Sequence, residues 1–367
     1  MKRFFIIAGE ASGDLHAAEL VKQIRLREAK ATFAGFGGDR MAEAGCYLYR
    51  HIRYMAFMGF AAVIRHWRDV KENFRIAHEA LLKEQPDVLI LIDYPSFNLQ
   101  MASFCRKYLP QTKIIYYLPP KVWAWKKHRI HKIARLCDEV LGIFPFEPGF
   151  YAQYGYSCTY VGHPTVEQIE MFKVESLKFK GETIAILPGS RPSEISNCLP
   201  RMLTAARQFP NHPITVCAAP GIEEDFYAPY LHEGEKLTHD TYGTVQKAAA
   251  AIVNSGTATL ETALLGCPQV AVYHIALSGL IKCLRWIRPL FFSIPYFTPV
   301  NIIAGKEVIK ECLADDFTAE NVATELQRLL TDEAYKKEML ASYKHLRSFL
   351  GSQSASATAA DIITSIQ

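Results

Sequence analysis

Short apolar runs rich in Val, Ile, Phe and Tyr alternate along the whole chain with longer segments of helical periodicity. This alternation is typical of βαβ units, whose parallel strands are buried on both faces of a sheet and therefore read as continuous apolar runs. After Thr318 the pattern predicts helices only. The predicted strands are Arg3–Gly9, Thr32–Gly37, Asp87–Asp93, Lys113–Leu118, Glu139–Phe144, Cys158–Gly162, Thr183–Pro188, Ile214–Ala219, Ala251–Asn254 and Gln269–His274.

The strands fall into two series, each of which begins with a strand and a glycine turn. A charged run without a strand pattern, residues 167–182, separates them. Cores usually stop growing beyond ~250 residues, so 367 residues favour two domains. We predict two doubly wound, Rossmann-like α/β domains, residues 1–166 and 183–345, with ligands at the carboxyl ends of the strands facing a common cleft. The C-terminal helix, within residues 346–367, is predicted to cross back onto the first domain.

Composition and charge disfavour several classes of protein. The net charge of +4 comes without the dense basic stripe of nucleic-acid-binding proteins, so no nucleic-acid partner is expected. Nine scattered cysteines, with no Cys-x-x-Cys pair and no ligand-like spacing with His, predict a reducing cytoplasm and no metal site. We expect no secretion signal at the amino terminus. The uncharged stretch 262–281 is interrupted by Gly266-Cys267-Pro268, which favours a helix, a turn and a buried strand over a membrane span.

The first turn, in the stretch FFIIAGEASGDLH that begins at Phe4, has the strand–glycine–helix order of a dinucleotide site. The dinucleotide fingerprint requires Gly-x-Gly-x-x-Gly, so that the backbone can approach a pyrophosphate. Here Gly9 and Gly13 are four residues apart, and Glu10 and Asp14 lie in the turn. Because two carboxylates would repel a diphosphate, this turn is a poor cradle for one.

Two turns in the second series are better suited to phosphate. The first, Gly189-Ser190-Arg191, follows a strand and offers close backbone approach, a hydroxyl and a guanidinium. The second, Ser255-Gly256-Thr257, opens a helix whose free N–H groups form an anion site, and Glu261 lies one turn further on, where it can accept ribose hydroxyls. The structural alternatives are an exposed arginine in an ordinary turn, and an N-cap with an exposed helical glutamate.

Taken together, the motifs resemble the lipid A disaccharide synthase family, inverting GT-B glycosyltransferases of the cytoplasmic membrane face. The matching pieces lie in the family's order, and no single one would suffice. They are GEASGD at 9–14, IDYPSFN at 92–98, VWAW at 122–125, FPFE at 144–147, VGHP at 161–164, LPGSR at 187–191, SGTATLE at 255–261 and NIIAG at 301–305.

The resemblance implies transfer of 2,3-diacylglucosamine from UDP-2,3-diacylglucosamine to the 6-hydroxyl of 2,3-diacylglucosamine 1-phosphate (lipid X). It implies no metal and no cofactor, since the UDP-sugar is a substrate. It places the UDP in the second domain and makes Asp93 the general base. It gives Asn98 a role in orienting the substrate or the loop. The implied UDP-binding residues are Ser190, Arg191, Ser255, Gly256, Thr257, Glu261 and Asn301. The implied acceptor-side residues are Glu10, Ser12, Asp14 and Asn98.

Several interpretations stay open. Asp93 can instead cap the next helix, and His163 before Pro164 is as typical of a packing residue as of an acid or base. The chain departs from the family pattern at Ser96, where a second acid is common, at Pro119, where Ser is usual, and at Glu167, where Asp is common. These departures put a role for the second acid in doubt but leave the diphosphate motifs intact.

Because both substrates carry acyl chains, we expect peripheral contact with the inner membrane. Two segments interleave apolar and basic residues in the pattern of an interfacial helix, although each taken alone is also typical of an amphipathic core helix. Their apolar members are Phe60, Val63, Ile64 and Trp67 in the first segment, and Trp286, Phe291 and Phe292 in the second.

Two other functions fit part of the pattern. A UDP-GlcNAc 2-epimerase-like enzyme shares the fold but has no use for basic-aromatic patches or for Val122-Trp123-Ala124-Trp125. A catalytically silent UDP-sugar-binding protein would bind UDP without turnover. A homodimer through the C-terminal helices is compatible with the sequence, and nothing in the residues demands it.

Overall fold

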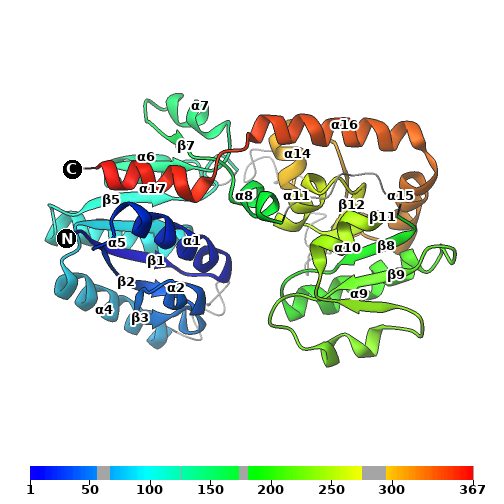
Figure 1. The fold of residues 1–367 in the computed structure, drawn as a ribbon, viewed down its shortest axis with the longest axis horizontal. Coiled ribbons are helices and arrows are strands. Elements are labelled where there is room, and N and C mark those ends of the chain that lie inside the picture. The colour runs from blue at the N-terminus through cyan, green and yellow to red at the C-terminus, as the bar shows by residue number, and fades with distance from the viewer. Residues whose placement is uncertain (56–66, 125, 173–180, 275–294, 367) are drawn as a thin grey trace. The chain divides into compact units, whose positions relative to one another are not determined.

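The computed structural model describes residues 1–366 except 56–66, 125, 173–180 and 275–294. The chain forms two compact units, which are described one at a time (Figure 1). Unit 1 comprises Met1–Pro164 and Gln353–Gln367, and unit 2 comprises Thr165–Ser352.

Unit 1 is built on a parallel sheet of seven strands in the order β3-β2-β1-β4-β5-β6-β7. The strands are β1 Arg3–Ala8, β2 Thr32–Gly37, β3 Tyr47–His51, β4 Val88–Ile92, β5 Lys113–Tyr117, β6 Glu139–Gly142 and β7 Thr159–Tyr160. The helices are α1 Ala11–Arg27, α2 Asp39–Glu43, α4 Trp67–Glu84, α5 Pro95–Tyr108, α6 Arg129–Leu136, α7 Glu147–Ala152 and α17 Ala355–Ser365.

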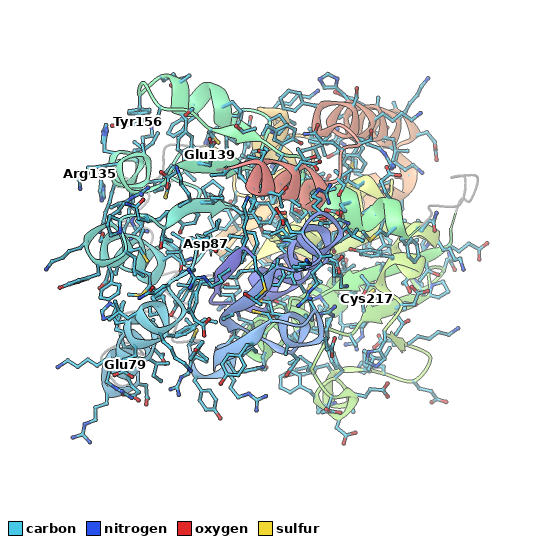
Figure 2. The ribbon with its side chains drawn as sticks, turned by 60° about the vertical axis from the view of Figure 1, so that its left-hand side comes forward. Glu79, Asp87, Arg135, Glu139, Tyr156 and Cys217 are labelled. Carbon is cyan, nitrogen blue, oxygen red and sulfur yellow. The ribbon has the colours of Figure 1, made fainter. Side chains whose placement is uncertain are left out.

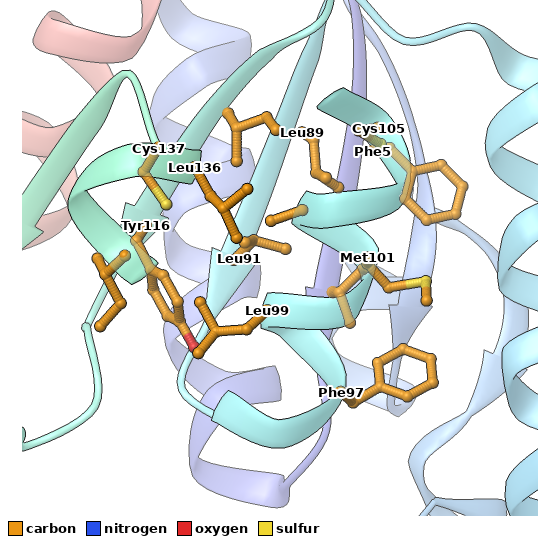
Figure 3. Close-up of a cluster of buried hydrophobic side chains, with 14 of the residues drawn as sticks. Phe5, Leu89, Leu91, Phe97, Leu99, Met101, Cys105, Tyr116, Leu136 and Cys137 are labelled. Carbon is orange, nitrogen blue, oxygen red and sulfur yellow. The ribbon is translucent and has the colours of Figure 1, made fainter. Parts of the chain in front are cut away.

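Both faces of this sheet are covered, which explains why its central strands are apolar at every position. In β1, Phe5 and Ile7 join a cluster with residues of α5 and α6, whereas Phe4 and Ile6 join a second cluster with residues of α1 and α17. Figure 3 shows the first cluster, in which Tyr116 of β5 packs among leucines of β4, α5 and α6. The alternation of side chains along a strand therefore fills two separate cores.

Unit 2 is built on a parallel sheet of six strands in the order β10-β9-β8-β11-β12-β13. The strands are β8 Thr183–Leu187, β9 Ile214–Cys217, β10 Lys236–Thr238, β11 Ala248–Asn254, β12 Gln269–Tyr273 and β13 Lys310–Leu313. The helices are α8 Pro164–Met171, α9 Pro192–Ala206, α10 Thr241–Lys247, α11 Thr257–Leu264, α14 Pro299–Ala304, α15 Ala319–Thr331 and α16 Glu333–Leu350. Cys217 ends β9, and its side chain is buried (Figure 2).

All ten predicted strands occur, most of them ending one or two residues earlier than predicted. The helical pattern predicted after Thr318 is likewise confirmed by α15, α16 and α17. Among the described residues, three strands were missed, β3, β10 and β13, and each lies at an edge of its sheet. An edge strand is partly exposed and therefore lacks the continuous apolar run by which buried strands are recognised.

The chain crosses between the units at different residues from those predicted. The predicted linker at 167–182 begins inside α8, so its first residues are helical. The predicted start of the last segment, residue 346, lies inside α16, and the return to unit 1 begins at Gln353. The difference arises because α16 continues its helical pattern to Leu350, where Gly351 ends it with a positive φ of 68°.

Helix α17 is an integral part of unit 1, although it is last in sequence. It lies beside α1 (Figure 1). The side chain of Arg27 donates to Asp361 at 2.5 Å, and the Lys2 ammonium donates to the Thr364 carbonyl at 2.7 Å. Its inner face is fully buried through Ala359, Ala360 and Ile363. The first and last segments of the chain are thus packed together.

In the described part of the chain, no helix has both the length and the apolar character that crossing a bilayer requires. The stretch that begins at Thr262 forms the end of α11, a turn at Gly266 and the buried strand β12, as the sequence predicted. Its last residues, 275–281, lie outside the described residues.

Candidate active site

Each sheet has one point at which the order of successive strands reverses. It lies between β1 and β4 in unit 1 and between β8 and β11 in unit 2. In open α/β sheets, ligands bind outside the carboxyl ends of the strands at such a point. The predicted site residues near Asp93 and near Ser190 flank these two positions.

In unit 1, β4 ends in a strained kink that carries Asp93. Asp93 and Tyr94 have φ angles of 42° and 44°, a left-handed conformation that residues other than glycine rarely adopt. The Tyr116 hydroxyl donates to the Asp93 carbonyl at 2.6 Å, and the Asn98 side-chain amide donates to the same carbonyl at 2.7 Å and to the Ile92 carbonyl at 3.1 Å. These buried donors hold the kink, and the Asp93 side chain is exposed at the sheet edge.

The opening turn of the chain lies against this kink. A Cβ built on Gly9 would be 2.3 Å from Cγ of Tyr94, so only glycine lets the turn approach the Tyr94 ring so closely. The Tyr94 hydroxyl donates to the Met55 carbonyl at 2.9 Å. Burial, with a smaller contribution from the Glu10 carboxylate, raises the pKa of Tyr94. Glu10 and the exposed Ser12 therefore lie at the same edge of the sheet as Asp93.

Asp14, by contrast, has a structural role. It is buried, and its carboxylate accepts hydrogen bonds from the backbone N–H groups of Gly38 at 2.6 Å, Met41 at 3.1 Å and Arg40 at 3.2 Å. These are the first N–H groups of α2, which a carboxylate satisfies well. Because three N–H groups of the fold already occupy this buried carboxylate, Asp14 stabilises the start of α2 and does not belong to the proposed site.

A second buried carboxylate, Glu147, explains two of the sequence motifs. It accepts hydrogen bonds from the backbone N–H groups of Ile143 and Phe144 at 2.8 and 2.9 Å and from the Trp123 indole N–H at 3.0 Å. Burial, opposed by these donors, raises the pKa of Glu147 to about 7. The Trp123 ring packs edge-on against Phe144 and Phe146. Glu147 thus fixes the loop after β5, and sequence analysis gave it no such role.

That loop presents Lys121 beside Asp93. The Lys121 side chain is exposed, and its ammonium lies 5.7 Å from the centroid of the Phe144 ring. Although Asp93 is also exposed, the protein around it removes part of its hydration and raises its pKa, whereas the Lys121 charge lowers it. Desolvation lowers the pKa of Lys121, and the charges of Asp93 and Glu147 raise it. Asp93 therefore has a cationic neighbour that sequence analysis did not identify.

In unit 2, the turn after β8 gathers hydrogen-bond donors. Gly189 has a φ of 123°, and a Cβ there would be 2.7 Å from Nδ2 of Asn254. The Ser190 backbone N–H donates to the Glu194 carboxylate at 3.0 Å, and the Arg191 guanidinium donates to the same carboxylate at 3.0 Å. The two groups predicted to bind a diphosphate thus converge on one anionic side chain.

The turn after β11 lies next to it, because β8 and β11 are paired through Leu187 and Val253. Helix α11 begins at Thr257, with Gly256 as its N-cap. A Cβ on Gly256 would meet no atom within 4 Å, so the turn borders open space. Ser255 is half-buried and Thr257 is exposed. The first N–H groups of α11 therefore face the same sheet edge as Ser190 and Arg191.

Glu261 lies one turn into α11 and is partly buried. Burial raises the pKa of Glu261 to about 6, and a hydrogen bond with the Tyr242 side chain of α10 acts in the opposite direction. The Glu261 carboxylate is thus fixed by a neighbouring helix. This arrangement suits a group that accepts hydroxyl donors.

Asn301 has no hydrogen-bonding capacity left for a substrate in this structure. Its side-chain oxygen accepts from the N–H groups of Val308 at 2.7 Å and Ile309 at 3.0 Å, and its amide donates to the Ile309 carbonyl at 2.9 Å and the Glu311 carboxylate at 3.0 Å. The side chain is fully buried. Asn301 thus ties α14 to β13 and does not belong to the proposed donor site.

The residues predicted to touch the membrane cannot be placed. Trp67 is the first residue of α4, but its side chain is outside the part of the chain that the structure describes. The remaining six, Phe60, Val63, Ile64, Trp286, Phe291 and Phe292, lie outside the described residues.

Comparison with solved structures supports the fold. A UDP-GlcNAc 2-epimerase from Neisseria meningitidis bound to UDP-GlcNAc matches with a TM-score of 0.67 at 9% identity, covering 100% of both chains. MurG from Acinetobacter baumannii matches with a TM-score of 0.58 at 13% identity, covering 100% of both chains. At such low identity these likenesses show the fold alone, and with the two parallel sheets they confirm the predicted GT-B class.

Comparison of sequences is more specific. The family model for lipid-A-disaccharide synthetase matches residues 4–363. A lipid-A-disaccharide synthase from Trichlorobacter lovleyi is 34% identical over 380 residues, covering 100% of this chain and 97% of the relative. One from Myxococcus xanthus is 35% identical, covering 98% of this chain and 96% of the relative. This chain therefore belongs to the lipid-A-disaccharide synthetase family of glycosyltransferases.

Proposed function

We propose that this chain transfers 2,3-diacylglucosamine from UDP-2,3-diacylglucosamine to the 6-hydroxyl of lipid X, forming a β-1,6-linked disaccharide 1-phosphate and UDP. Family membership supports the reaction. The observation that supports this chemistry is the position of Asp93. The residue is exposed at the strand reversal of unit 1, and buried hydrogen-bond donors hold its strained backbone. Strained backbone held by buried donors is typical of functional sites.

Asp93 is the general base of this mechanism. Its carboxylate takes the proton of the acceptor 6-hydroxyl while that oxygen attacks the anomeric carbon from the face opposite UDP. The bond between the anomeric carbon and the diphosphate oxygen breaks in the same displacement, which inverts the anomeric configuration. General-base catalysis typically contributes about 10²–10⁴-fold. Glu10 and Ser12, at the same sheet edge, accept and donate to hydroxyls of the acceptor sugar.

Unit 2 holds the donor and stabilises the leaving UDP. The Ser190 N–H and the Arg191 guanidinium bind the diphosphate in place of Glu194, which they contact in this structure. The N–H of the N-cap Gly256 and the first N–H of α11, at Thr257, add fixed donors. The Ser255 N–H already donates to the Val272 carbonyl at 2.7 Å, so Ser255 contributes through its hydroxyl, and Glu261 accepts the ribose hydroxyls. Fixed donors aimed at developing negative charge are worth about 3–4 kcal/mol each in other enzymes.

The test is incubation of purified protein with both substrates, with the disaccharide followed by mass spectrometry. We expect turnover by the wild type, a loss of about 10²-fold or more in Asp93→Asn with UDP affinity retained, and a loss of UDP affinity in Arg191→Ala. Binding of UDP without any product would identify a silent binding protein. Conversion of UDP-GlcNAc into its 2-epimer would identify the epimerase-like alternative.

The location of the enzyme follows from the substrates. We propose that it acts at the cytoplasmic face of the inner membrane and contacts the bilayer peripherally, because both sugars carry acyl chains. Flotation with anionic and zwitterionic vesicles tests this proposal, and equal recovery with and without vesicles would contradict it. A homodimer is compatible with the sequence, and analytical ultracentrifugation checks it.

A further inference from the structure

Lys121 lies on an unusually well-fixed loop for an exposed lysine. Its neighbours Pro119, Pro120, Val122 and Trp123 are all buried, and Trp123 is held by Glu147. The Ala124 N–H donates to the Lys121 carbonyl at 3.0 Å. A surface lysine normally loses side-chain and backbone conformational entropy when it binds a ligand. Because folding has already ordered the backbone around Lys121, only the side-chain part of this entropy is lost on binding.

The ammonium is also without an anionic partner at ion-pair distance in the described part of the chain. Among the described residues the ammonium contacts the Phe144 ring, and the charged groups that act on it are Asp93 and Glu147, with His163 close enough to be affected by its charge. Glu147 is already taken by three N–H donors. Asp93 is the proposed base. A cation carried by an ordered backbone beside a base is suited to an anionic group on the same substrate.

The acceptor of the proposed reaction has such a group. In a hexopyranose 1-phosphate, the carbon that bears the phosphate and the carbon next to the 6-position flank the ring oxygen. A sugar with its 6-hydroxyl at Asp93 therefore carries its phosphate only a few bonds away, at the same edge of the sheet. Asp93 and Lys121 are brought to this edge by neighbouring strands, since the Asp93 N–H donates to the Leu118 carbonyl at 3.2 Å.

We infer that Lys121 binds the phosphate of the acceptor, so that unit 1 selects a phosphorylated sugar over its unphosphorylated counterpart and aligns the 6-hydroxyl with Asp93. This inference rests on the proposed function. The ligand class is a sugar 1-phosphate monoester, held by a charge-assisted hydrogen bond from the ammonium to a phosphate oxygen.

The experiment compares two acceptors, lipid X and dephosphorylated 2,3-diacylglucosamine, in steady-state assays of four proteins. These are the wild type, Lys121→Gln, Lys121→Arg and the control Lys30→Gln. Lys30 is exposed in the turn before β2, at the opposite edge of the same sheet, so its replacement removes the same charge from the same unit.

In Lys121→Gln we expect KM for lipid X to rise about 10- to 100-fold, in the range of a charged hydrogen bond, with KM for the dephosphorylated acceptor unchanged. Lys121→Arg should retain most of the preference for lipid X, and Lys30→Gln all of it. Equal losses with both acceptors, or a shift in the pH profile of kcat without a change in preference, would overturn the inference and leave Lys121 as a group that tunes Asp93.

The two proposals fail in different ways. If the wild type forms disaccharide and Lys121→Gln keeps its preference for lipid X, only the inference about Lys121 is wrong. If the wild type turns over neither acceptor, the proposed function is wrong. Calorimetric binding of the two acceptors in detergent then tests Lys121 without catalysis: weaker binding of lipid X alone in Lys121→Gln supports the inference, and unchanged binding refutes it.

Discussion

Four acidic residues near the strand ends of unit 1 differ in what the fold leaves available to a ligand. Asp14 and Glu147 are buried, and each accepts three N–H donors. Glu10 is half-buried and Asp93 is exposed. A buried carboxylate that accepts three N–H donors stabilises a turn, and an exposed carboxylate beside a strained backbone can accept a proton. The candidate base Asp93 therefore differs from the other three acidic residues in its hydrogen bonding, and not in its residue type.

His163 provides a test of acid stability. Burial, assisted by the nearby His16 and Lys121, lowers the pKa of His163 to about 3, whereas an unfolded histidine has a pKa of about 6.5. Since the unfolded chain binds the additional proton between these values, the free energy of unfolding falls as the pH drops below about 6.5. The loss is about 2 kcal/mol at pH 5.

Urea unfolding at pH 7, 6 and 5 checks this expectation. His163→Gln removes the titrating group. Between pH 7 and pH 5 the free energy of unfolding of the variant should therefore fall by about 2 kcal/mol less than that of the wild type. Parallel pH profiles for the two proteins would show that His163 is not held neutral by the fold.

Tyr116 is expected to be a positioning residue for Asp93. In Tyr116→Phe the Asp93 carbonyl loses its 2.6 Å donor, which should lower kcat about tenfold through misplacement of the base and lower the free energy of unfolding by about 1 kcal/mol. The matched control is Tyr151→Phe in the same core, because no described group hydrogen bonds the buried Tyr151 hydroxyl. A similar kcat in both variants would contradict a positioning role for Tyr116.

At the scale of elements, the turns at the carboxyl ends of the central strands carry the proposed chemistry, and the opposite ends carry structural contacts. Asp87, before β4, accepts the Arg3 backbone N–H at 2.7 Å and thereby joins the amino ends of β4 and β1 (Figure 2). The turn after β8 instead leaves Ser190 and Arg191 exposed. Parallel strands place all turns of one kind at one edge, which concentrates the ligand-binding groups.

Gly189→Ala tests the turn after β8. The φ of 123° disfavours any L side chain, and the new Cβ would lie 2.7 Å from Asn254 and 2.8 Å from Glu194. The substitution would introduce strain of about 1–3 kcal/mol, and the turn would relieve it by moving the donors of Ser190 and Arg191. We therefore expect UDP affinity to fall about tenfold or more. Gly234→Ala is the control, because Gly234 has a φ of 89° with no atom within 4 Å of the added Cβ. Calorimetric titration with UDP measures both variants, and equal affinities would refute the assigned role of the turn.

At the scale of the whole molecule, the last helix completes the unit that contains the first strand. Ile363 of α17 is fully buried against the second core of unit 1, and the adjacent Ile362 is only partly buried. Ile363→Ala should therefore lower the free energy of unfolding of unit 1 by about 2–5 kcal/mol.

UDP affinity should not change in Ile363→Ala, because the proposed donor site is built from residues of unit 2. Ile362→Ala serves as the control and should cost clearly less stability. Differential scanning calorimetry and UDP titration together check this prediction, and loss of UDP binding in a folded Ile363→Ala protein would contradict it.

The strands at the centre of each sheet, and the turns that follow them, could be predicted from the amino-acid sequence alone. Continuous apolar runs exist because both faces of a central strand are buried, and the glycine and polar residues after them mark where backbone must approach a ligand. The two-unit α/β architecture, the family, and Asp93, Ser190 and Arg191 as candidates all followed from these local signals.

Which candidate side chains remain available to a ligand, and which edge strands complete the sheets, became evident from the three-dimensional structure. Asp14 and Asn301 read as ligands in sequence, but N–H groups 24 to 27 residues further along the chain occupy the Asp14 carboxylate, and groups 7 to 10 residues further along occupy the Asn301 amide. The sequence did not indicate a role for Lys121, because its position beside Asp93 depends on the pairing of β4 with β5. Hydrogen bonds and charges act between neighbours in space, and a local pattern does not encode which distant residues become neighbours.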